Sequence, residues 1–175
     1  MTDALVMTII GQDRPGLVES IAKVVADHGG NWLESRMCQL GGEFAGILRI
    51  QVQSSQKNQL IAALEQLSVR GLNVVVRPDS VNVAPNYSRR ALLEIVGHDR
   101  PGIVRQISSA LAGQSVNVEE LSSECESAPM TGEILFKAQI TLQIPAGCCM
   151  DALQQNLEKI AGDLMVDFRF AELNQ

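Results

Sequence analysis

Aromatic side chains are scarce in this chain of 175 residues. One Trp, one Tyr and four Phe make up 3% of the sequence, whereas hydrophobic residues as a whole make up 46%. The apolar total is typical of a folded globular protein, so we expect a packed core built mainly from aliphatic side chains and methionine. A surface with so few rings offers little for stacking on nucleic-acid bases.

Positive charge is also in short supply. The chain has 14 Lys and Arg against 20 Asp and Glu, which gives a formal net charge of −6 at pH 7. A surface of this sign repels a phosphate backbone instead of releasing its counterions. The only basic doublet, Arg89-Arg90, is interpreted as solvated charge at the end of a linker. The composition therefore predicts no direct contact with nucleic acid.

Long apolar runs and metal-binding motifs are missing too. The apolar run at residues 4–10 is too short for a signal peptide or a membrane span, so we expect a cytoplasmic protein with no membrane contact. The cysteines are Cys38, Cys125, Cys148 and Cys149, without the CxxC or Cys/His spacing of a metal site. We therefore predict no metal and no cofactor, and interpret Cys148-Cys149 as a reduced pair near the start of a helix.

The sequence contains an internal duplication. Residues 11–18 and 97–104 are identical at six of eight positions and lie 86 residues apart. At the same offset Ile21 matches Ile107, Ala26 matches Ala112, and Asn31 matches Asn117. Because the match extends through a loop, a helix and the next strand, each half is predicted to be one copy of the same unit.

Each half alternates strand-like and helix-like hydrophobic patterns. In the first half the pattern predicts strands at 5–9, 31–40, 43–53 and 72–76, a helix at 17–28, and a second helix carrying Leu60, Leu64 and Leu67. Ser54-Ser55 is predicted to cap that second helix, and Gly41-Gly42 to form a hairpin turn. The second half is predicted to repeat the order with strands at 93–95, 116–126, 134–144 and 164–170, and helices at 103–111 and 150–160.

The predicted fold class is therefore α+β, with two ferredoxin-like βαββαβ units in tandem. We expect a first domain at residues 1–78, a linker at 79–89, which contains Pro85 and directly follows Pro78, and a second domain at 90–175. A four-stranded sheet leaves edges that need pairing or protection. We expect the halves to associate, and the chain to be able to form a homo-oligomer.

The repeated GxDRPG loop carries the candidate site. It lies between a strand end and a helix start, where free N–H groups and the helix dipole favour an anion such as a carboxylate. Asp13 is a candidate helix cap or ammonium partner, and Asn31 offers both a donor and an acceptor. These groups suit a small zwitterionic amino acid. The alternative is that the loop is only a tight turn, and the residues alone favour neither interpretation.

The candidate ligand-binding residues occupy the loop, the first helical position and the next strand. In the first half they are Gly11, Asp13, Arg14, Gly16, Leu17 and Asn31, and in the second half Gly97, His98, Asp99, Arg100, Gly102, Ile103 and Asn117.

Sequence motifs for catalysis are missing. The two histidines are His28, near a helix end, and His98, which stands where the first half has Gln12 and is a candidate hydrogen-bonding partner of a ligand. The chain has no nucleophile elbow, Walker loop or HExxH motif. We predict no catalytic residues and no enzyme activity.

The strand, GxDRPG loop, helix and Asn-starting strand together resemble the ACT domain, a regulatory module that in many families binds amino acids at this loop. Two such modules in tandem resemble the glycine cleavage system transcriptional repressor family. Residues 11–18, Asn31, residues 34–36 and residues 40–44 are similar to that family's first domain. The loop motif alone is also shared with the front module of formyltetrahydrofolate deformylase.

The resemblance implies a regulator without its own DNA-binding domain. It would act on glycine-cleavage genes through a partner activator, for example of the LysR type, with glycine as its ligand. The intact second loop at residues 99–102 departs from the enteric repressors, so both loops are candidate sites and the ligand stays open. The alternative is an amino-acid sensor that regulates a metabolic enzyme allosterically.

Overall fold

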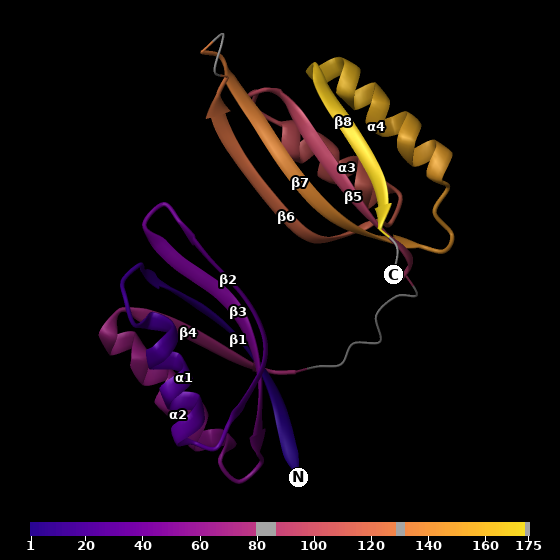
Figure 1. The fold of residues 1–175 in the computed structure, drawn as a ribbon. Coiled ribbons are helices and arrows are strands. Elements are labelled where there is room, and N and C mark those ends of the chain that lie inside the picture. The colour runs from indigo at the N-terminus through magenta and orange to yellow at the C-terminus, as the bar shows by residue number, and fades with distance from the viewer. Residues whose placement is uncertain (80–86, 129–131, 174–175) are drawn as a thin grey trace. The chain divides into compact units, whose positions relative to one another are not determined.

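The computed structural model describes residues 1–79, 87–128 and 132–173 (Figure 1). The chain divides into two compact units between Asn82 and Val83. Residues 80–86 of the predicted linker lie outside the described residues. The first strand of the second unit begins at Tyr87, which is three residues before the predicted start of the second domain.

The first unit is a four-stranded sheet covered by helices on one face (Figure 1). Its strands follow the order β2-β3-β1-β4, and each neighbouring pair is antiparallel. The elements are β1 (Thr2–Gln12), α1 (Leu17–Asp27), β2 (Asn31–Leu40), β3 (Glu43–Gln53), α2 (Lys57–Glu65), a 3₁₀ segment η1 (Gln66–Arg70) and β4 (Leu72–Pro78).

The second unit repeats this arrangement. Its strand order is β6-β7-β5-β8, again with antiparallel neighbours. The elements are β5 (Tyr87–His98), α3 (Ile103–Gly113), β6 (Asn117–Ser127), β7 (Ile134–Pro145), α4 (Met150–Leu164) and β8 (Val166–Leu173). The predicted α+β class, with two ferredoxin-like βαββαβ units, is confirmed.

Alternation along the strands decides which face of each sheet is buried. Successive side chains of a strand point to opposite faces, so the apolar residues at every second position share one side. In β1 these are Leu5, Met7 and Ile9, which are buried against Ile21 and Val25 of α1. Burying such a side chain stabilises the fold by about 1.5–3 kcal/mol. The helices of each unit lie on one face of its sheet, and no helix of the described residues covers the opposite face within that unit.

Two local predictions had different outcomes. Gly41 and Gly42 form the predicted hairpin turn, with φ angles of 59° and 84° that glycine adopts without strain. The predicted cap at Ser54-Ser55 is wrong, because α2 begins at Lys57 after Gln56 and has no side-chain cap. The Ser54 hydroxyl instead donates to the Met1 carbonyl at 3.1 Å.

Candidate ligand site at the strand-to-helix loops

Both loops end in a glycine that begins a helix with free N–H groups. Gly16 and Gly102 have φ angles of 87° and 96°, in the left-handed region that favours glycine. The Ser20 N–H donates to the Gly16 carbonyl oxygen at 2.9 Å, and the Gln106 N–H donates to the Gly102 carbonyl oxygen at 3.0 Å. These are the first hydrogen bonds of the two helices. No described side chain caps either end. The preceding helical N–H groups are therefore available to an anion.

Leu17 and Ile103 anchor the two helices. Both side chains are buried in the core of their own unit. Their side chains therefore cannot contact a solvent-borne ligand, and only their backbone N–H groups remain for one. Each loop is thus held in place by one buried apolar side chain, while the N–H groups at the start of its helix stay accessible.

Gly11 and Gly97 are required by packing against the same chain. A Cβ at Gly11 would lie 2.5 Å from the Gly71 carbonyl oxygen, and one at Gly97 would lie 2.5 Å from Val166 Cγ1. The absence of a side chain therefore lets β1 approach β4, and β5 approach β8. The space beside these two glycines is therefore filled by the protein itself and is closed to a ligand.

Asp13 and Asp99 tie the loops to the neighbouring hairpins. The Asp13 N–H donates to the Gly42 carbonyl at 2.9 Å, and the Asp99 N–H donates to the Ile134 carbonyl at 3.0 Å. Asp13 does not cap α1, so that half of the prediction is wrong. Desolvation, followed by the charge and hydrogen bond of Asp99, raises the pKa of the Cys125 thiol. The Asp99 carboxylate therefore faces the end of β6.

The two loop arginines differ in their contacts. The Arg14 guanidinium donates to the carbonyl of Arg70 at the end of η1, which holds the first loop against that segment. Among the described residues, Arg100 makes a long contact of 3.9 Å to Met165 Sδ. Arg14 is therefore committed to the fold, whereas the charge of Arg100 stays at the surface.

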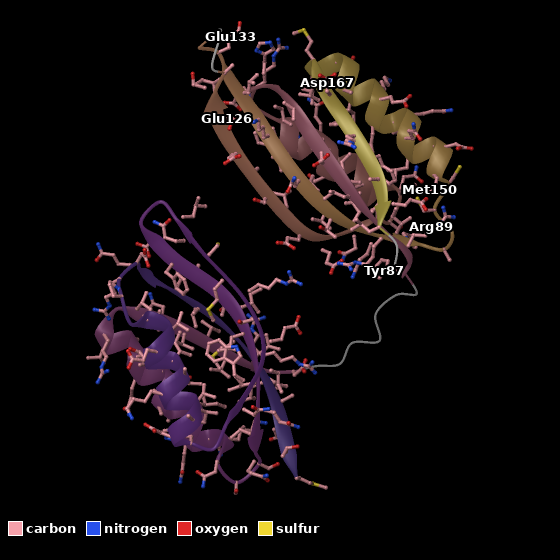
Figure 2. The ribbon with its side chains drawn as sticks, viewed as in Figure 1. Tyr87, Arg89, Glu126, Glu133, Met150 and Asp167 are labelled. Atoms are coloured by element: carbon pink, nitrogen blue, oxygen red, sulfur yellow. The ribbon has the colours of Figure 1, made fainter. Side chains whose placement is uncertain are left out.

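The histidines occupy different environments. His28 follows α1, where its Nδ1 lies 2.8 Å from the Val24 carbonyl oxygen. His98 ends β5, and its Nδ1 lies 3.7 Å from a Glu133 carboxylate oxygen. Figure 2 shows Glu133 at the end of the unit where β6 and β7 meet. His98 thus lies beside the second loop, as its sequence position predicted.

Asn31 and Asn117 are separated from the loops of their own units. Asn31 pairs with Gln51, which is opposite Ala4, whereas the loop follows Gln12. The eight positions between Ala4 and Gln12 span about 26 Å at ~3.3 Å per residue. In the second unit the Asn117 side-chain amide donates to Gln143 at 3.0 Å. Within one unit the structure does not bring the asparagine and the loop together.

Sequence reasoning missed a charge difference between the two helix starts. Glu19 lies in the first turn of α1, and the residue at the same offset in α3 is the exposed Arg105. Aligning the copies at their offset of 86 residues would have revealed this reversal. The second helix start therefore offers an anion a more positive environment than the first.

The adjacent cysteines lie at the start of α4, as predicted. Cys149 immediately precedes the helix, Cys148 packs partly against the core, and both are free thiols. Burial raises the pKa of the Cys148 thiol. Across the described ranges, no three His, Cys, Asp or Glu side chains cluster as metal ligands, and no helix is long and apolar enough to cross a membrane.

Comparison with known proteins identifies the family of this fold. The family model described as the ACT domain matches residues 3–76. A UPF0237 protein of Methanopyrus kandleri is 31% identical over 78 residues, which cover 45% of this chain and 81% of the relative. The first unit of the chain is an ACT domain. The second unit repeats the strand order and the loop of the first, so the ACT-like units are in tandem.

Two relatives match both ACT-like units together. The glycine cleavage system transcriptional repressor of Escherichia coli K12 is 25% identical over 164 residues, covering 91% of this chain and 85% of the repressor. The crystal structure of an unknown protein from Galdieria sulphuraria is 26% identical, with a TM-score of 0.88, and covers 99% of this chain and 100% of its own. The predicted resemblance to the repressor family is thereby confirmed.

Proposed function

We propose that this tandem ACT protein senses a small amino acid at its strand-to-helix loops and regulates transcription through a protein partner in the cytoplasm. The observation that carries the proposal is the pair of uncapped helix starts behind Gly16 and Gly102. A carboxylate accepts hydrogen bonds from such N–H groups and is favoured by the helix dipole. Similarity to a named transcriptional repressor over both units supports the regulatory role, which needs no catalytic step.

The loop chemistry suits a zwitterion. The helix N–H groups would hold the ligand carboxylate, and the Asp13 or Asp99 side chain would lie toward its ammonium group. Glycine is the first candidate ligand, because the similar repressor is named for the glycine cleavage system. Calorimetry with glycine, serine and alanine tests the ligand class. If none of them binds at millimolar concentration, the loops are structural turns.

The charge reversal between Glu19 and Arg105 predicts different preferences at the two loops. A ligand with an additional carboxylate, such as aspartate, should prefer the second loop. A charge near a helix start contributes about 0.3–1 kcal/mol, so reversing its sign should change affinity on the order of three- to thirtyfold. We expect Arg105→Glu to weaken aspartate binding and Glu19→Arg to strengthen it. Equal affinities in wild type and both variants would contradict this assignment.

Asn31 and Asn117 can contact a loop-bound ligand only from another ACT-like unit. Because β1 separates Asn31 from its own loop, a ligand that contacts both an asparagine of this kind and a loop must be shared between two ACT-like units, either of one chain or of two copies. Losing a hydrogen bond to a charged ligand group weakens affinity about ten- to a hundredfold. Asn31→Ala should weaken binding to this extent if the ligand is shared, and affinity should rise with protein concentration if the two units belong to different copies. Unchanged affinity would limit the site to the loop.

The proposed transcriptional role acts through contact with an activator. The net charge of −6 disfavours a phosphate backbone, so purified protein should not retard promoter DNA on its own. When a LysR-type activator is bound to a glycine-cleavage promoter, we expect the protein either to slow the complex further in a gel shift or to release the DNA. Glycine should reverse the effect. Sequence-dependent binding of the isolated protein to DNA would refute this mechanism.

Allosteric control of a metabolic enzyme is the second candidate function. It uses the same fold and loops and differs only in the partner. Affinity capture with the wild-type chain, followed by reconstitution from purified components, separates the two. An activator whose promoter complex responds to the protein supports the first function, and an enzyme whose rate responds to it supports the second.

A further inference from the structure

The duplication provides an internal comparison between two helix-free sheet faces, which we call the open faces. Strand register aligns their side chains row by row. In the second unit the central row is polar, and runs from β6 to β8 through Ser122, Gln139, Glu94 and Arg169. In the first unit the same row runs from β2 to β4 through Arg36, Ile47, Thr8 and Val75. The two open faces therefore differ in polarity along this row although the folds match.

The first open face carries large apolar side chains that its own unit leaves exposed. Ile10, Ile47 and Val75 are 50%, 55% and 53% exposed, and they lie on three neighbouring strands. The second unit has Gln139 and Arg169 in place of Ile47 and Val75. A contiguous exposed apolar surface marks an interaction site. The second open face shows that the fold accepts polar residues at the positions of Ile47 and Val75, so these two apolar side chains are not a requirement of folding.

The first open face carries opposite charges at its two edges. One row runs through Glu34 on β2, Arg49 on β3, Val6 on β1 and Arg77 on β4. Arg49 is paired with Asp79 at 2.7 Å. Glu34 and Arg77 form no ion pair within the described part of the chain, and lie three strand spacings, about 14 Å, apart.

This arrangement complements itself. A second copy turned about a two-fold axis parallel to the strands presents its β4 to the β2 of the first copy. Its Arg77 then lies opposite Glu34, and its Glu34 opposite Arg77, while the apolar centres of the two faces meet. Sheets pack face to face about 10 Å apart with interdigitating side chains, and a two-fold contact uses the same surface on both copies.

We propose that the open face of the first unit is the contact surface of a symmetric dimer, where it packs against the same face of a second copy. The apolar centre drives association, and the two Glu34–Arg77 pairs between copies set its orientation. The second open face takes no part in this contact. This inference is independent of the ligand and of the proposed regulatory role.

Exchanging residues between the two faces tests the apolar centre. The variant Ile47→Gln with Val75→Arg gives the first face the residues of the second, at positions half exposed and therefore tolerant. Four apolar side chains leave the contact, so the dissociation constant measured by analytical ultracentrifugation should rise on the order of a hundredfold or more. Val96→Gln on the second open face is the matched control and should leave the constant unchanged.

Charge reversal tests the orientation. Arg77→Glu alone and Glu34→Arg alone should each weaken the dimer, because each places like charges opposite one another. The combination should restore wild-type association. Since the two side chains are too far apart to pair within one unit, restoration reports a contact between copies. Circular dichroism verifies that every variant is folded.

Three results would overturn the proposal. They are a wild-type chain that remains monomeric at its highest soluble concentration, a dimer that persists in the Ile47→Gln, Val75→Arg variant, and a double charge reversal that does not restore association. If the wild-type chain is a monomer and its first open face is protected from hydrogen exchange only when another protein is added, the face belongs to a different partner.

Discussion

Replacing Gly97 by alanine separates a packing role of the loop glycine from a role in ligand access. The added Cβ would lie 2.5 Å from Val166 Cγ1, 2.7 Å from Val166 Cα and 2.8 Å from the Met165 carbonyl oxygen. Two of these atoms belong to the backbone and cannot rotate away, so β5 and β8 must move apart. Overpacking of this kind lowers the free energy of unfolding by about 1–3 kcal/mol. Alanine also restricts the unfolded chain more than glycine does, which raises the free energy of unfolding by about 0.4–1 kcal/mol.

The expected net loss of about 1–2 kcal/mol should lower the melting temperature of the second unit by about 5–15 °C. Differential scanning calorimetry measures this change. Gly113→Ala is the matched control, because Gly113 ends α3 and a Cβ there meets nothing within 4 Å. We expect the control to melt at the wild-type temperature or slightly above it, since alanine favours a helix more than glycine does.

Two results would refute this reasoning. One is that the Gly97→Ala protein melts like wild type. The other is that it keeps its stability but loses binding of a small amino acid. The second result would show that Gly97 belongs to the ligand site, because the added methyl group would then exclude a ligand without disturbing β8.

Two further predictions concern side chains around the loops. Arg14→Met should destabilise the first unit by about 0.5–1.5 kcal/mol in urea unfolding, because a hydrogen bond to the backbone is lost, whereas Arg100→Met should have little effect; equal effects would contradict the difference in contacts. The raised pKa of the Cys125 thiol means that less thiolate is present near pH 8.5 than in a free thiol, so its alkylation should be slow there. Asp99→Asn removes the negative charge and should lower that pKa, which speeds alkylation measured by peptide mass spectrometry. An unchanged rate would show that Asp99 does not act on the thiol.

The sequence by itself determined the duplication, the element order and the buried face of each sheet. Alternation along residues 134–144 predicted β7, and the periodicity after Pro15 and Pro101 predicted α1 and α3. These features are local and repetitive, because a strand that buries one face needs apolar residues at every second position. The Gly41-Gly42 turn also follows from local conformation.

Only the tertiary structure decided how distant segments meet. Strand register places Asn31 at the far end of the sheet from the first loop, and chain contacts assign Gly11 to packing and Arg14 to η1. Ser54 contacts the N-terminal residue instead of capping α2. Each of these contacts joins residues far apart in sequence, so no local pattern encodes it. The pairing of strands also aligns Glu34 with Arg77 across the open face, because a row of the sheet exists only once four separate segments are in register.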